Sequence, residues 1–242
     1  MTAVAASPPV GAVETVDLAV TPLRELNQRL HHLARDDTGL RHWRVLHPNG
    51  AHALACGLDA DVVVEIEGHA GYYCGGMNKR ATVRVRGSAG TGVAENMMSG
   101  EVHVAGDVSQ AAGASGHGGL LLVEGNAAAR CGISMKGIDI VVKGSVGHMS
   151  AFMAQAGNLV VLGDAGEALG DSIYEAQLYV RGKPKSLGAD CIEKPLREAH
   201  KTELRRLLDA AQLGGEIDVA EFKRYGSARK LYNFHVDNVD AY

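Results

Sequence analysis

The sequence predicts an all-β fold, a right-handed parallel β-helix of about seven coils, on the basis of a glycine that recurs every nineteen residues. The glycine keeps this spacing without a slip across nearly half of the 242-residue chain. Repeats of this length are typical of solenoids, in which a coil buries its apolar face only against its neighbours. The structural repeat glycines are Gly68, Gly87, Gly106, Gly125, Gly144, Gly163 and Gly182.

Aliphatic residues stand two and four positions before every repeat glycine, from Val64 and Ile66 in the first repeat to Leu178 and Val180 in the last. A spacing of two is the periodicity of a β-strand, and the β-branched residues among them favour a strand as well. Seven positions after the glycine, the first six repeats have only glycine or alanine, which predicts close backbone packing or a positive φ there. Parallel strands joined by crossovers are overwhelmingly right-handed.

The segment before the repeats predicts a short N-terminal cap of mixed α/β structure. Residues 1–12 are expected to form a disordered tail, because they lack the basic start and apolar run of a signal peptide. Within the cap, residues 13–57, Pro22 and an apolar stripe of leucines predict a helix. Asn49-Gly50, between residues 43–46 and 51–54, predicts a β-hairpin.

The β-helix itself is expected to cover residues 58–183, and the segment 184–230 to form a helical C-terminal cap over its far end. An apolar stripe around Leu204 to Ala211, followed by Gly214-Gly215, predicts one helix, and residues 221–230 a second, shorter one. Residues 231–242 lack helical spacing and are expected to form an extended arm.

One outward-facing series, three residues before the glycines, changes character along the stack. It is polar in the first three repeats and apolar afterwards, so we expect its apolar part to be covered by a terminal segment or by a partner protein. The candidate partner interface combines this part with aromatic residues of the arm: Leu122, Val141, Val160, Tyr179, Tyr232, Phe234 and Tyr242.

Composition and charge exclude several classes of function. The net charge of −4 and the lack of long Lys/Arg runs give no support for nucleic-acid binding. No apolar run reaches the roughly 20 residues that cross a membrane, so we expect a cytoplasmic protein. Cys74 and Cys131 share an offset but lie three coils apart, about 14 Å by strand spacing, too far for a disulfide. The four cysteines are expected to be packed thiols.

The sequence contains no recognisable catalytic or ligand-binding motif. The eleven histidines include four within the repeats, and those four occupy four different offsets, so stacking does not gather them into a metal site. No glycine-rich loop matches a dinucleotide site or a P-loop, and no nucleophile has a recognisable partner motif. We therefore expect no catalytic, cofactor-binding or metal-binding residue in this chain.

The repeat resembles the C-terminal β-helix domain of the large subunit of glutamate synthase over about residues 54–183. The resemblance is carried by period, strand offsets and glycine triplets together, in the stretches EGNAAARCGISMKGIDIVVKG and GHMSAFMAQAGNLVVLG. With short caps at both ends, the chain is most similar to the stand-alone β-helix subunits of N-methylglutamate synthases, where the parts of glutamate synthase are separate polypeptides.

The resemblance implies a scaffold subunit without catalytic side chains of its own. Its implied partners are a class II glutamine amidotransferase-like subunit and an FMN-dependent, glutamate synthase-like subunit that carries FMN and an iron–sulfur cluster. The implied overall reaction converts methylamine and L-glutamate into N-methyl-L-glutamate and ammonia, a step of methylamine and one-carbon metabolism.

Three alternatives remain open at this stage. The same β-helix occurs in the C subunits of formylmethanofuran dehydrogenases and in the related formyltransferase/hydrolase complexes of one-carbon metabolism. Other right-handed β-helices cleave polysaccharides, but the repeats here contain no acidic ladder and few aromatic platforms. The chain could also be a self-associating scaffold without an enzyme partner.

Overall fold

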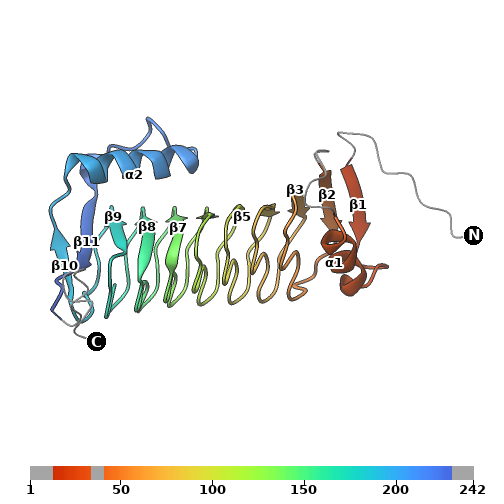
Figure 1. The fold of residues 1–242 in the computed structure, drawn as a ribbon, viewed down its shortest axis with the longest axis horizontal. Helices are drawn as coiled ribbons and strands as arrows, with labels where there is room; N and C mark the ends of the chain where they lie inside the picture. The colour runs from red at the N-terminus through yellow and green to blue at the C-terminus, as the bar shows by residue number, and fades with distance from the viewer. Residues whose placement is uncertain (1–12, 34–40, 231–242) are drawn as a thin grey trace, which may run out of the picture.

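The computed structural model describes residues 13–33 and 41–230, and these form a right-handed parallel β-helix (Figure 1). Its strands belong to one sheet in the order β1 to β9, then β11, then β10. The strands are β1 (Val13–Asp17), β2 (Arg41–Leu46), β3 (Val62–Ile66), β4 (Thr82–Val85), β5 (Glu101–Val104), β6 (Leu120–Val123), β7 (Lys136–Val142), β8 (Ala156–Val161), β9 (Gln177–Val180), β10 (Cys191–Lys194) and β11 (Lys223–Ser227).

The nineteen-residue period becomes the register of the sheet. Val64 pairs with Val83, Val83 with Val102 and Val102 with Leu121, so that each coil lies in register on the one before. The aliphatic residues two and four positions before the repeat glycines are buried and belong to a continuous apolar core. The predicted fold class is therefore confirmed.

Each coil continues after its strand through a bend in which three alternate residues have left-handed backbone. The residue seven positions after the repeat glycine has φ between 57° and 69° from Gly75 to Gly170, as the small residues there predicted. The residues five and nine positions after it are left-handed too, although tyrosine, arginine and methionine occur among them. The backbone of each bend is hydrogen-bonded to both neighbouring coils. In one bend, the N–H groups of Ala111 and Ser115 donate to carbonyl oxygens of the next coil, and that of Gly113 donates to the preceding coil.

The N-terminal cap contains the predicted helix but not the predicted hairpin. Helix α1 (Leu23–His31) buries Leu26 and Leu30 against the first turns of the core. Strand β2 pairs in parallel with both β1 and β3. With both of its edges occupied, β2 has no free edge for residues 51–54 to pair with, and these form the first left-handed bend instead.

The C-terminal cap is arranged differently from the prediction. Helix α2 (Glu198–Ala210) lies lengthwise along the side of the coils rather than across their end (Figure 1). The predicted second helix, residues 221–230, is wrong: a short 3₁₀ turn, η1 (Val219–Glu221), leads into β11. Strand β11 pairs antiparallel with the open edge of β9. Backbone groups exposed at that edge favour an added strand over a local helix.

Candidate interaction site

The repeat glycines form a ladder in which backbone packs directly on backbone. A Cβ atom added to Gly87 would lie 2.8 Å from the carbonyl carbon of Gly68, and one added to Gly144 would lie 2.6 Å from the carbonyl oxygen of Gly125. Most of these glycines therefore meet a close approach rather than a positive φ, which only Gly68 among them shows. Their role is to let successive coils touch.

Beside the glycine ladder runs a second ladder, of polar side chains, which the sequence reasoning missed. The side chain of the residue after a repeat glycine accepts a hydrogen bond from the backbone N–H of the equivalent residue in the next coil. Asp107 accepts in this way from Asn126 (2.7 Å), and Asn126 accepts from Ser145 (2.9 Å). The available signal was a polar or charged residue at this offset in every repeat. The ladder comprises His69, Ser88, Asp107, Asn126, Ser145, Asp164 and, as final donor, Lys183.

The apolar outward series is covered by the chain's own C-terminal segment. Leu122 is 6% exposed, and Val141, Val160 and Tyr179 at most 1%. They form a separate apolar cluster with the buried face of α2 and with η1 and its flank: Leu204, Leu207, Leu208, Ala211, Val219 and Phe222. Of the two expected covers, the terminal segment is the one present, so these four residues are not open to a partner protein. Tyr232, Phe234 and Tyr242 lie outside the described residues.

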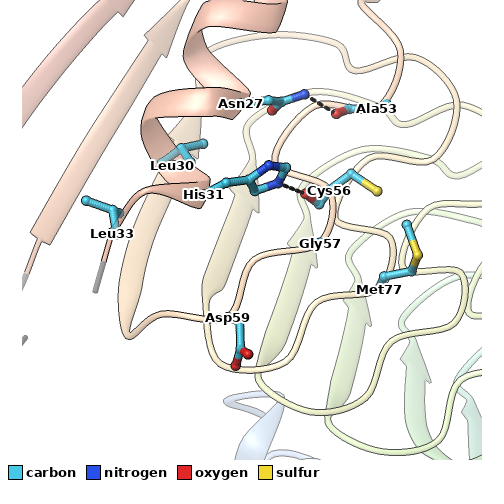
Figure 2. Close-up of a pocket in the computed structure, with 9 residues that line it drawn as sticks. All are labelled: Asn27, Leu30, His31, Leu33, Ala53, Cys56, Gly57, Asp59 and Met77. Atoms are coloured by element: carbon cyan, nitrogen blue, oxygen red, sulfur yellow. Dashed lines mark hydrogen bonds between the residues drawn. The ribbon is translucent and has the colours of Figure 1, made fainter. Parts of the chain in front are cut away.

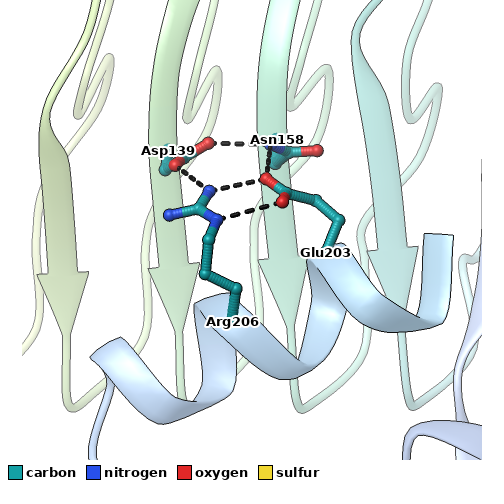
Figure 3. A network of polar contacts seen from close by, with 4 residues as sticks. All are labelled: Asp139, Asn158, Glu203 and Arg206. Atoms are coloured by element: carbon teal, nitrogen blue, oxygen red, sulfur yellow. Dashed lines mark hydrogen bonds and ion pairs between the residues drawn. The ribbon is translucent and has the colours of Figure 1, made fainter. Parts of the chain in front are cut away.

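A polar network fixes the register of α2 on the coils (Figure 3). Arg206 of α2 donates to Asp139 of β7 (2.6 Å) and to Glu203 of α2 (2.5 Å), and Asn158 of β8 donates to both carboxylates. The hydrogen bonds from Arg206 hold the pKa of the Glu203 carboxyl below its usual range, so the ion pair is formed near neutral pH.

At the other end, α1 is fastened over the first bend (Figure 2). Asn27 donates to the carbonyl of Ala53 (2.9 Å) and accepts from the N–H of Ala55 (3.2 Å), and the His31 ring lies 2.7 Å from the carbonyl oxygen of Cys56. A shallow cavity of about 380 Å³ lies between helix and bend. Side-chain contacts to backbone carbonyls thus close this end of the core.

Several large side chains on the first two repeats are exposed to solvent: Tyr72, Tyr73, Met77 and Met98. Tyr72 is 51% exposed and stacks on His52 at 4.4 Å between ring centroids, while Met77 is 52% exposed. Met77 lies outside the core, unlike Cys74 and Met135, which are fully buried. Its position has a left-handed backbone, and the later repeats place Asn96, Ser115, Ser134, Met153 and Ser172 there.

Comparison with known proteins identifies the family of the chain. No family model matches it. Protein GlxC of Rhizobium meliloti (strain 1021) is 63% identical over 227 residues, which cover 94% of this chain and 99% of the relative. The chain belongs to the GlxC family.

Histidines of this GlxC-family chain form side-chain contacts with carboxylates. His103 contacts Glu124 (2.9 Å), and His47 contacts Asp17 (2.7 Å). All four cysteines are free. Burial raises the pKa of the Cys74 and Cys131 thiols to about 12, so both are protonated and unreactive near pH 7.

Within residues 13–33 and 41–230 of this GlxC-family chain, no three His, Cys, Asp or Glu side chains gather where they could hold a metal ion. Neither α1 nor α2 has the length and apolar character that crossing a bilayer requires.

Proposed function

We propose that the chain is the non-catalytic scaffold subunit of a glutamate synthase-like enzyme complex, specifically of an N-methylglutamate synthase. The observation that carries this proposal is the use of polar side chains along the coils. From His69 to Asp164, the polar ladder binds backbone N–H groups of the next coil, and other residues pair across neighbouring coils. Such a chain supplies a rigid rod to which catalytic subunits bind.

Membership of the GlxC family at nearly full length, together with the resemblance to the β-helix of glutamate synthase, supports the choice of complex. The proposed partners are a class II amidotransferase-like subunit and a subunit that carries FMN and an iron–sulfur cluster. Together they would convert methylamine and L-glutamate into N-methyl-L-glutamate and ammonia in the cytoplasm.

The exposed residues Tyr72, Tyr73, Met77 and Met98 form the surface that we propose for one of these partners. Tyrosine and methionine are enriched at protein–protein interfaces, and tyrosine buries a large area at a low conformational-entropy cost. This surface lies on the first repeats, away from α2, which covers the later ones.

The test is purification of the full chain, with an affinity tag, from cells that express it with its neighbouring genes. We expect two larger subunits and the absorbance of flavin to co-elute, and the complex to form N-methyl-L-glutamate from methylamine and L-glutamate, detected by mass spectrometry. Co-elution of a formyltransferase would instead assign the chain to a formylmethanofuran-type complex. A lone, unchanged monomer would contradict both complexes.

A matched pair of variants tests the partner surface in the same preparation. Replacing Tyr73 and Met77 by serine removes apolar area from a solvent-exposed surface, so folding should be unchanged while co-elution of one partner is lost. The control replaces Val20, which is 83% exposed and lies on the N-terminal cap, by serine. Full retention of both partners by the Tyr73 and Met77 variant would show that they bind elsewhere.

A further inference from the structure

A cavity of about 510 Å³ lies where the start of α2 meets β9, β10 and β11, and its wall is strongly cationic. Four basic side chains line it, those of Lys194, Arg197, Arg224 and Arg229, against one carboxylate, that of Glu175. Four positive charges and one negative charge leave an excess of three positive charges. The volume lies within the range of small-molecule sites.

The central cation of this cavity is buried. Arg224 of β11 is only 7% exposed, and it donates to the carbonyl oxygen of Pro195 (3.1 Å) and to the side-chain oxygen of Gln177. A guanidinium has five N–H donors, so these two bonds leave donors for a ligand. A buried cation is unfavourable unless it is paired, and Arg224 has no ion pair among the described residues.

The neighbouring charges are only partly compensated. Arg229 pairs with Glu175 (2.9 Å), and Lys194 donates to the carbonyl of Ser227 (2.5 Å), which carries no charge. Arg197 forms no ion pair with any residue that the structure describes, and it precedes α2, whose N-terminal N–H groups also favour negative charge. Burial, then the charges of Arg224 and Arg197, lower the pKa of His200 in the same wall.

We propose that this cavity binds a small anionic metabolite, one that carries phosphate or carboxylate groups. The guanidinium groups of Arg224 and Arg197 would bind the anionic oxygens in bidentate fashion, a geometry that suits both kinds of group. Because the wall is built from the C-terminal cap, a bound anion would also hold α2, β10 and β11 together. This inference does not depend on the enzyme complex proposed above.

The proposal is tested by calorimetric titration of the full chain with inorganic phosphate, pyrophosphate or citrate at constant ionic strength. We expect saturable binding of one molecule per chain, and a higher unfolding temperature, for at least one probe. Which probe binds distinguishes phosphate from carboxylate ligands. Absence of saturable binding by all three would overturn the proposal.

Variants of two arginines distinguish a site from general attraction between charges. Arg197→Ala should weaken binding about tenfold, the loss of one charge-assisted contact, and Arg197→Lys should recover part of it. The control is Arg205→Ala, which removes the same charge from an exposed position of α2 outside the cavity and should change binding less than about twofold. Equal weakening by both alanine variants would contradict a defined site.

Discussion

At the scale of single residues, the structure separates two reasons for a small residue. The repeat glycines are needed because the backbones of neighbouring coils touch, as at Gly125, where an added Cβ would lie 2.9 Å from the carbonyl carbon of Gly106. Gly132, in the same coil, is left-handed with φ of 69°, and its added Cβ would meet only the ends of Met135 and Ile140 at 3.2 Å or more. Alanine already occupies the equivalent left-handed position at Ala151.

This contrast predicts the effects of two Gly→Ala substitutions. Gly125→Ala should destabilise the protein by about 3 kcal/mol, because backbone must move to admit the methyl group. Gly132→Ala should cost about 1 kcal/mol, the penalty of a left-handed alanine. Denaturant unfolding followed by circular dichroism measures both, and equal losses would show that the close approach at Gly125 is unimportant.

At the scale of elements, helix α2 is the part whose position depends on few contacts. Its attachment combines the apolar cluster around Leu207 with the network of Arg206, Asp139, Asn158 and Glu203. The helix packs on an apolar stripe formed by side chains of β6 to β9, and it takes no part in the hydrogen bonds between the strands. Its detachment would therefore leave the coils themselves intact.

Leu207→Ala should detach α2 without unfolding the coils. Leu207 is fully buried, and truncating such a side chain to alanine costs about 2 to 5 kcal/mol of stability. This loss weakens the attachment of α2 and leaves the packing between the coils unchanged. Amide hydrogen exchange should accelerate across Glu198–Ala210 while strands β3 to β5 stay protected. Ala210→Gly, on the exposed side of the helix end, is the control, and it should leave the rest of α2 protected. Uniform acceleration in all strands with Leu207→Ala would contradict a separate attachment.

Acidification should loosen the same helix. The pKa of Glu203 is lowered in the folded state, so the carboxylate contributes stability that is fully present above its unfolded pKa of about 4.3. That contribution is lost as the pH falls through the lower, folded pKa. Exchange of α2, corrected for its intrinsic pH dependence, should rise below about pH 4. In Glu203→Gln, α2 should be less protected from exchange at pH 7 and should lose this part of the pH dependence. If the exchange of α2 in this variant depends on pH as in the unmodified chain, Glu203 does not cause the loosening.

At the scale of the whole molecule, both ends of the solenoid must be closed, because an open stack exposes backbone groups and core side chains. At the first end, β1 forms the edge of the sheet and helix α1 covers the core with Leu26 and Leu30. The second end is closed by β11, which pairs antiparallel with β9, and by β10, which pairs with β11 and forms the outer edge of the sheet. Tyr225 of β11 is 4% exposed and belongs to the main core.

Disrupting this closing strand should promote association. Tyr225→Asp places a charge in the core at the end of the stack, and we expect an unfolding free energy lower by about 3 kcal/mol or more and concentration-dependent oligomers by light scattering. Ile192→Asp, on neighbouring β10, is the control, because Ile192 is 44% exposed. If Tyr225→Asp keeps the oligomeric state of the unmodified chain at all concentrations, β11 does not prevent end-to-end contact.

The sequence by itself determined the coil. A period kept without a slip forces equal offsets to stack, and stacking decides the strands, the core face and the need for small residues between coils. It also showed that Leu122, Val141, Val160 and Tyr179 needed a cover. The left-handed bends at Tyr73 and Met77 were not visible, because the hydrogen bonds that hold them come from the neighbouring coils rather than from local propensity.

Only the tertiary structure decided what the flanking segments do. The local pattern at Asn49-Gly50 favours a hairpin and that of residues 221–230 a helix, but pairing depends on which sheet edges are free. Both edges of β2 are occupied, while the edge of β9 is open and accepts β11. The cationic cavity has the same origin, since it brings residues 174–177, 194–200 and 224–229 together. A repeat specifies its own neighbours through its period, whereas a unique segment finds its place only through the surface that the repeats leave exposed.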